Sequence, residues 1–196
     1  MKRIKLRREI SRRMGMNMYQ EMAQRTSPDD GHDRIDNGVL GLIGETGEIV
    51  DLYKKYVYQS VARTELPAEK IMEELGDVIW YLAELSTGLG EFMAAIMRGE
   101  FADYDRNIET KKKQKQLCLR RIILSMAANA NAICEAADEG KLRHVEFLMR
   151  KMMFGAGNLA FMCGGSLQDA AEANIEKLKK RYPDGFDAQI SMNRYV

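Results

Sequence analysis

Hydrophobic residues recur every three or four positions along most of the chain, and the strict alternation that is typical of β-strands is absent. This spacing places apolar side chains on one face of a helix. Two stretches carry the pattern most clearly. The first contains Leu42, Ile43, Ile49, Val50 and Leu52, and the second contains Ile71, Leu75, Val78, Ile79 and Leu82. Met, Ala, Leu, Glu and Lys, which favour helices, are abundant, and only 3 prolines occur. The chain is therefore predicted to be all-α.

The predicted helices are separated where Gly, Pro and Asp cluster. The first predicted helix covers about residues 4–25, and the second ends near Tyr58. Further helices are predicted at 67–87, 91–99, 117–139 and 142–163, and the last one begins at Ser166. Ser166 and Asp169 fit a capping box in its Asp form. Residues 98–116 are predicted to form a polar linker. His32, in the loop after the first helix, is predicted to be a solvated side chain.

A weak internal repeat is also present. Residues 40–51 align with 124–135, and residues 75–83 align with 154–162. The alignment predicts a single all-α domain over residues 1–196 that consists of two pseudo-repeated halves. The first half, about 1–98, carries acidic residues that the second half, about 117–190, lacks. In the second half, Asn129, Ala132, Met153 and Ala156 stand where the first half has Glu45, Glu48, Glu74 and Asp77.

The charge and the cysteine content argue against a nucleic-acid-binding, membrane or disulfide-rich protein. The 30 Lys and Arg residues nearly balance the 29 Asp and Glu residues, which argues against a dedicated surface for nucleic acid or anionic membranes. The 3 cysteines have no metal-type spacing and are expected to be reduced thiols. No apolar run reaches the roughly 20 residues that a membrane span needs, and no signal peptide is expected. We expect a cytoplasmic protein.

Two pairs of carboxylates are the candidate chemistry: Glu45 with Glu48, and Glu74 with Asp77. Residues three apart share a helix face. If the two helices pack side by side, the four acids converge, and each raises the pKa of the others. A divalent cation such as Mg²⁺, which prefers oxygen ligands, would relieve this repulsion. In a chain with 30% charged residues, one isolated acid pair is usually a solvated helix face.

Other known carboxylate sites do not fit this chain. A ferritin-like di-iron site needs Glu-x-x-His pairs, and neither histidine follows a glutamate by three. An EF-hand needs an Asp-rich loop, which is absent.

Further residues lie on the same predicted faces. In the last helix, Asn174, Lys177 and Arg181 form one polar stripe suited to phosphate oxygens. Lys55 lies two turns beyond Glu48. Tyr81 follows Asp77 by one turn, and its neighbour Trp80 is predicted to be a core or dimer-interface aromatic.

Three motifs together resemble a known family. GETGE at 44–48, EELGD at 73–77 and NIEKLKKRYPDGF at 174–186 are similar to the MazG-like, all-α nucleoside triphosphate pyrophosphohydrolases. MYQEMAQRT at 18–26 and Asn37 also look like that family. The resemblance covers residues 18–87 and 166–186, and residues 91–165 depart from the family pattern. One acidic half joined to a degenerate half is similar to the dimeric dUTPases of the same superfamily.

The resemblance implies a MazG-like bundle that hydrolyses a nucleoside triphosphate to the monophosphate and pyrophosphate. It implies that Mg²⁺, or Mn²⁺ in its place, is held by the four acids. It also implies substrate contacts from Asn37, Lys55, Asn174, Lys177 and Arg181, with Tyr81 in the base or sugar pocket. A homodimer or a pseudo-dimeric monomer is expected. The alternatives are a non-catalytic helical protein that binds nucleotides or partners, and a relative that cleaves a phosphoribosyl-linked nucleotide.

Overall fold

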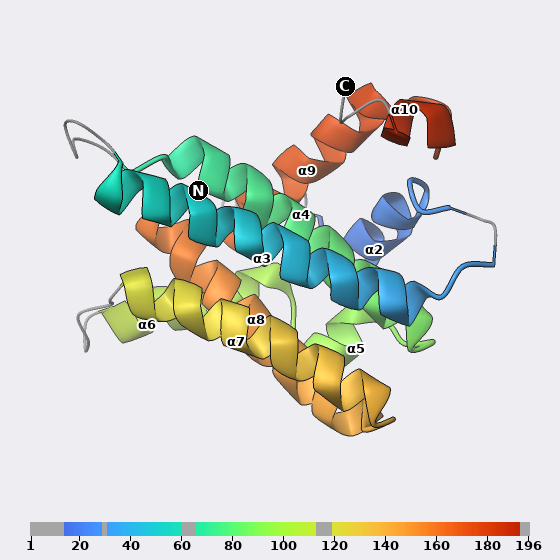
Figure 1. The fold of residues 1–196 in the computed structure, drawn as a ribbon, viewed down its shortest axis with the longest axis horizontal. Helices are drawn as coiled ribbons and strands as arrows, with labels where there is room; N and C mark the ends of the chain where they lie inside the picture. The colour runs from blue at the N-terminus through green and yellow to red at the C-terminus, as the bar shows by residue number, and fades with distance from the viewer. Residues whose placement is uncertain (1–13, 29–30, 60–65, 113–118, 193–196) are drawn as a thin grey trace, which may run out of the picture.

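A computed structural model describes residues 14–28, 31–59, 66–112 and 119–192 (Figure 1). Within these ranges the regular structure is helical, which confirms the predicted all-α class. The helices are α2 (Met16–Gln24), α3 (Arg34–Tyr58), α4 (Ala68–Gly88), α5 (Met93–Met97), α6 (Phe101–Lys112), α7 (Leu119–Asp138), α8 (Leu142–Met162), α9 (Leu167–Arg181) and α10 (Ala188–Met192).

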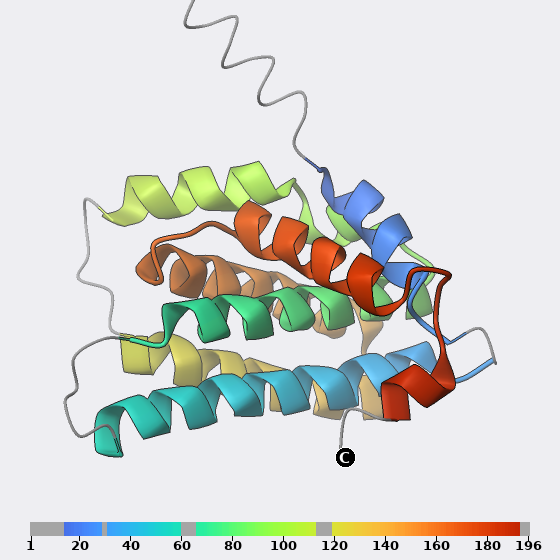
Figure 2. The ribbon, with the colours of Figure 1, turned by 90° about the horizontal axis from the view of Figure 1, so that it is seen from above.

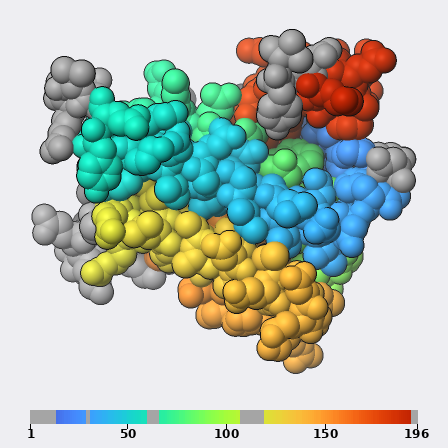
Figure 3. Space-filling view, viewed as in Figure 1, coloured from blue at the N-terminus to red at the C-terminus, as the bar shows by residue number. Residues whose placement is uncertain are grey.

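Four long helices form the body of the molecule. Helix α3 packs along α4, α7 packs along α8, and α3 also lies beside α7. Each of these three pairs is antiparallel (Figures 1 and 2). In the space-filling view, α3 and α7 lie side by side and cover one face of the molecule (Figure 3). The predicted apolar stripes face the core, because Leu42, Ile49, Ile71, Leu75, Val78, Ile79 and Leu82 are all fully buried.

Two of the shorter helices lie on α4, whereas α6 packs against α8 and α9. Helices α9 and α2 both pack against α4, and α2 also contacts α9. The predicted capping box at the start of α9 is confirmed. Ser166 Oγ accepts a hydrogen bond from Asp169 N at 3.1 Å, and Asp169 Oδ2 accepts one from Ser166 N at 2.9 Å. The cap fixes where α9 begins and therefore which of its side chains face α4.

The predicted polar linker at 98–116 is wrong over most of its length, because α6 occupies Phe101–Lys112. Phe101 is fully buried and lies edge-to-face against Tyr19, with 5.8 Å between ring centroids. Asp103 accepts a hydrogen bond from Glu100 N at 2.9 Å at the start of the helix. The start of this polar helix is also tied to α9, because Leu167 N donates a hydrogen bond to Asp105 Oδ1 at 3.0 Å.

Two terminal segments also differ from the prediction. The predicted first helix, 4–25, lies partly outside the described residues, and α2 begins at Met16. The short helix α10 was not predicted. None of the helices in the described part of the chain has the length and apolar character needed to cross a membrane.

Candidate functional site

Three of the four predicted acids come together between α3 and α4. Helix α3 presents Glu45 and Glu48 one turn apart, and α4 presents Glu74. One carboxylate oxygen from each lies within 4.8 Å of the others. Glu48 is exposed, and the other two are partly buried. Leu42 and Ile49 on α3 are fully buried in the core, which fixes the rotation of α3 about its axis and hence the position of both of its glutamates.

The cluster carries more negative charge than its surroundings balance. Burial, and then the nearby charges of Asp77, Glu48 and Glu74, raise the pKa of Glu45 to about 8, although Lys177 acts in the opposite direction. Burial also raises the pKa of Glu74, with further contributions from Glu48 and Asp77. Carboxylate oxygens are the donors that hard divalent cations prefer. The donor set and its excess charge therefore fit a Mg²⁺-type cation held by Glu45, Glu48 and Glu74.

The fourth acid, Asp77, lies next to this group but is bound by α9. Its Oδ1 accepts a hydrogen bond from Asn174 Nδ2 at 2.8 Å, and its Oδ2 lies 2.6 Å from Lys177 Nζ. Lys177 Nζ also lies 3.7 Å from Glu73 Oε1. Asn174 and Lys177, two residues predicted to contact the substrate, thus contact Asp77 in the structure.

A buried tyrosine that the sequence did not single out holds Asn174 in place. The hydroxyl of Tyr19, on α2, donates to Asn174 Oδ1 at 2.8 Å and also lies 3.4 Å from the carbonyl oxygen of Gly76. Tyr19 is fully buried, and burial, with a smaller effect of the Asp77 charge, raises its pKa well above the usual value. The hydroxyl therefore stays protonated and donates, so the Asn174 amide nitrogen is directed at Asp77.

Next to the cluster lies a cavity of about 190 Å³ with mixed polar and aromatic walls. It is lined by Thr26, Pro28, Asn37, Glu45, Asp77, Trp80, Tyr81, Leu178, Arg181, Tyr182, Phe186 and Ser191. Asn37, Tyr81 and Arg181 were predicted as substrate contacts, and the cavity brings them together. Trp80 was expected in the core or at an interface. It packs against the core, lines this cavity, and lies edge-to-face against Tyr81 with ring centroids 4.9 Å apart.

A buried carboxylate, that of Glu84, holds Asn37 and the segment before it, next to this cavity. Glu84, on α4, is fully buried, and its oxygens bind Arg34 at 3.0 Å and Ser27 at 2.9 Å. It also accepts a hydrogen bond from Asn37 Nδ2 at 3.3 Å. His32 Nε2 lies 2.8 Å from the same carboxylate, so the prediction of a solvated His32 is wrong. The network ties the segment between α2 and α3 to α4 and engages the Asn37 amide nitrogen.

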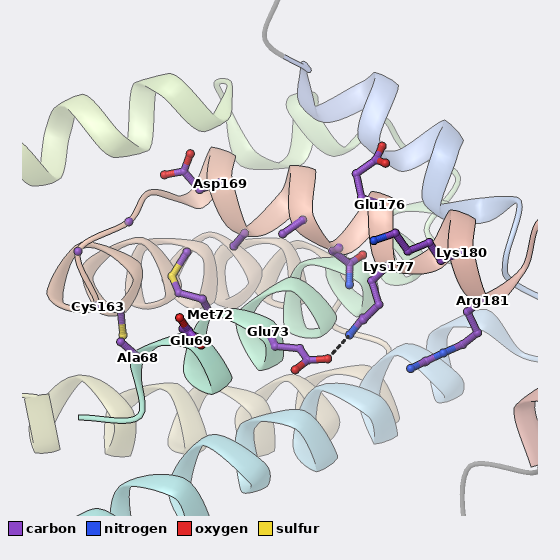
Figure 4. A pocket seen from close by; sticks show the side chains of 15 residues that line it. Ala68, Glu69, Met72, Glu73, Cys163, Asp169, Glu176, Lys177, Lys180 and Arg181 are labelled. Atoms are coloured by element: carbon purple, nitrogen blue, oxygen red, sulfur yellow. Dashed lines mark ion pairs between the residues drawn. The ribbon is translucent and has the colours of Figure 1, made fainter. Parts of the chain in front are cut away.

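A second, larger hollow of about 990 Å³ lies between α4 and α9 (Figure 4). Apolar residues such as Met72 and Cys163 line one end, while Lys177, Lys180 and Arg181 line the other. Arg181 belongs to both hollows, and Asp77 in the smaller one binds Lys177 in the larger one. The cationic face of α9 therefore lies where the two hollows meet beside the acid cluster.

Lys55 is the predicted substrate contact that the structure places apart from the others. Its Nζ lies 2.6 Å from Asp51 Oδ2, its side chain is 59% exposed, and it lines neither hollow. The spacing of two turns from Glu48 puts it on a similar face of α3, but further along the helix than the cluster.

Comparison with known proteins gives a partial alignment with one curated protein. No protein-family model matches the chain, and no solved structure matches it. The chain is similar to Gene 37 protein of Mycobacterium phage L5, with 34% identity over 58 residues, which is 29% of this chain and 51% of that protein. The chain thus spans about half the length of the curated relative it matches.

Proposed function

We propose that the protein is a Mg²⁺-dependent nucleoside triphosphate pyrophosphohydrolase with a MazG-like bundle. The observation that carries the proposal is the group of three glutamates within 4.8 Å, directly beside Lys177 and Arg181 on α9. Carboxylates that can hold a cation and side chains that can hold phosphate are the two parts that this hydrolysis needs. The adjoining cavity, with aromatic rings and an amide, is suited to a base or sugar.

In this proposal each residue has a defined task. Glu45, Glu48 and Glu74 hold Mg²⁺, which when bound neutralises phosphate charge and lowers the pKa of a coordinated water. A carboxylate that is not fully committed to the metal, Glu48 or Glu45, accepts the proton as the water oxygen bonds to the α-phosphorus. The bond from that phosphorus to the bridging oxygen breaks, and the departing pyrophosphate is held by Lys177 as a point charge and by Arg181 as a planar fork.

We also infer that the α3–α4 and α7–α8 pairs are two copies of one hairpin. Both pairs are antiparallel, with lengths of 25 and 21 residues in the first and 20 and 21 in the second. At the positions matching Glu45, Glu74 and Asp77, the second pair has Asn129, Met153 and Ala156, all buried. One half would then carry the cation site while the other supplies packing.

The decisive experiment measures pyrophosphate release over a panel of nucleoside triphosphates, with Mg²⁺ and with EDTA. We expect release that requires Mg²⁺ and that falls by about 10²-fold or more in Glu48→Gln and in Asp77→Asn. Lys177→Ala is expected mainly to raise KM. Glu139→Gln, an exposed acid paired with Lys141, is the matched control and should retain full turnover.

Two outcomes would contradict the proposal. Unchanged turnover in Glu48→Gln would remove the cluster from the reaction. Saturable nucleotide binding without release of pyrophosphate from any member of the panel would instead favour the non-catalytic nucleotide-binding protein.

A further inference from the structure

The two sets of acidic oxygens at the site differ in what they contact. In the described part of the chain, Glu45, Glu48 and Glu74 form no ion pair with a basic side chain, whereas both oxygens of Asp77 are engaged by α9. Lys177 Nζ lies 2.6 Å from Asp77 Oδ2, and Asn174 Nδ2 donates to Asp77 Oδ1 at 2.8 Å. Both carboxylate oxygens of Asp77 are therefore occupied by donors and are poorly placed to bind a cation. Three of the four carboxylates are therefore available to a cation in this arrangement, and Asp77 is engaged by α9.

The two partners of Asp77 differ in how freely they can move. Asn174 is 3% exposed and is fixed by the Tyr19 hydroxyl. Lys177 is 20% exposed, and its flexible stem lies along the open hollow between α4 and α9. Figure 4 shows Lys177 reaching across that hollow towards Glu73 on α4. The ammonium group thus has room to leave Asp77, and the amide does not.

A cation at Asp77 and the Lys177 ammonium compete for the same oxygen. The phosphates of a bound nucleotide would carry several negative charges and attract the ammonium group away from a single carboxylate. Metal binding at Asp77 and nucleotide binding would then favour each other, since a coupling between two ligands acts equally in both directions.

We propose that Lys177 is a latch on Asp77. In the absence of nucleotide, Glu45, Glu48 and Glu74 bind a divalent ion without Asp77. When the polyphosphate of the substrate draws Lys177 away, Asp77 becomes a further ligand. This inference rests on the proposed function and adds an order of events to it, in which the substrate completes the metal site.

The test uses binding of Mn²⁺ to the full-length chain, with free Mn²⁺ measured by electron paramagnetic resonance, so that no turnover is needed. Without nucleotide, Glu74→Gln is expected to weaken binding by about tenfold or more. Asp77→Asn should change it by less than about twofold. Lys177→Met should tighten it by about fivefold, and this gain should vanish in the Lys177→Met/Asp77→Asn double variant. Lys179→Met, an exposed cation of α9 paired with Glu176, is the matched control and should have no effect.

The same titration is then repeated with a non-hydrolysable nucleoside triphosphate that has an imido group between the α- and β-phosphates. Asp77→Asn is now expected to weaken Mn²⁺ binding by about tenfold. Far-UV circular dichroism checks that each variant is folded. If Asp77→Asn does not fold, Asp77→Ser replaces it in the single and double variants, because only the loss of the gain in the double variant separates ligation by Asp77 from a general effect of the Lys177 charge on the glutamates.

Different results overturn different claims. If Asp77→Asn weakens Mn²⁺ binding without nucleotide as much as Glu74→Gln does, Asp77 is already a ligand and the latch is wrong. An unchanged affinity in Lys177→Met also refutes the latch. Absence of Mn²⁺ binding by the wild-type chain, with and without nucleotide, would instead overturn the proposed function on which the latch depends.

Discussion

Gly76 and Asn174 are in contact at the crossing of α4 and α9, with no room for a further carbon atom between them. A Cβ on Gly76 would lie 2.9 Å from Asn174 Cβ and 3.1 Å from the carbonyl oxygen of Ala170. Because Asn174 binds Asp77, this contact sets how near the cationic face of α9 comes to the acids of α4. The glycine next to Asp77 in the EELGD motif is therefore explained by helix packing.

Gly76→Ala is expected to destabilise the protein and to reduce activity. Crowding against backbone and a Cβ costs about 1–3 kcal/mol, and the better helix propensity of Ala returns up to about 1 kcal/mol. Gly47→Ala is the matched control, because a Cβ there meets nothing within 4 Å, and it should gain about 0.5–1 kcal/mol. Urea denaturation measures both values. A Gly76→Ala variant as stable as Gly47→Ala would contradict the packing argument.

Tyr19→Phe is expected to lower both stability and turnover. It removes the donor to the buried Asn174 Oδ1, at a cost of about 1–3 kcal/mol. It also releases the Asn174 amide that holds Asp77. Tyr104→Phe is the matched control, since the Tyr104 hydroxyl donates to Met97 O at 2.9 Å away from the acid cluster. Steady-state kinetics should show a lower kcat in Tyr19→Phe only. Equal kcat values in the two variants would mean that Tyr19 has no positioning role.

Glu84→Gln should be strongly destabilising. The substitution leaves Arg34 without its charged partner in a network where Glu84 is fully buried, a change that costs on the order of 3 kcal/mol. The exposed pair of Glu139 with Lys141 provides the comparison, and Glu139→Gln should change stability by less than about 1 kcal/mol. Urea midpoints measure the difference. Similar midpoints for the two variants would show that the network contributes nothing.

Stability in the presence of a chelator should fall as pH rises between 4.5 and about 8. The pKa of Glu45 is raised from 4.5 to about 8 in the folded state. Between these values the folded protein holds a proton that the unfolded chain has lost, so the free energy of unfolding decreases with pH and levels off above about 8. Scanning calorimetry in EDTA should show this fall in Tm.

Glu45→Gln should flatten that slope, because the group that carries the proton is removed. Mg²⁺ should also oppose the fall, since it binds the deprotonated carboxylates of the folded state. If wild type and Glu45→Gln show the same pH dependence in EDTA, the pKa of Glu45 is not raised.

The sequence was informative where a local pattern determines the structure. The apolar period predicted the buried faces of α3 and α4. The spacing predicted that Glu45 shares a helix face with Glu48, and Glu74 with Asp77. Convergence of the four acids required in addition that the two helices pack side by side, and Glu45, Glu48 and Glu74 do come together. The capping box at Ser166 predicted the start of α9. The apolar stripes and the capping box depend on residues three or four apart, so a short segment of sequence is enough to predict each of them.

Features that depend on distant residues could not be read in the same way. His32 meets Glu84 across 52 positions, and no local pattern links a loop histidine to a carboxylate two turns beyond Asp77. Asn174 and Lys177 were correctly placed on one face, but their binding to Asp77 depends on the packing of α9 against α4. Helix α6 was missed because its sequence is mostly polar and its contacts, such as Phe101 with Tyr19 and Asp105 with Leu167, join residues far apart in the chain.

The hydrogen bond between Tyr19 and Asn174 joins residues 155 positions apart in the chain. During translation, the glutamates of α3 and α4 leave the ribosome long before the helix that completes their surroundings. Contacts of such long sequence separation also slow folding, because a long loop must close before they form. A chain that ends before α9 would therefore carry the acids of α3 and α4 without Asn174 and Lys177, the two side chains that bind Asp77.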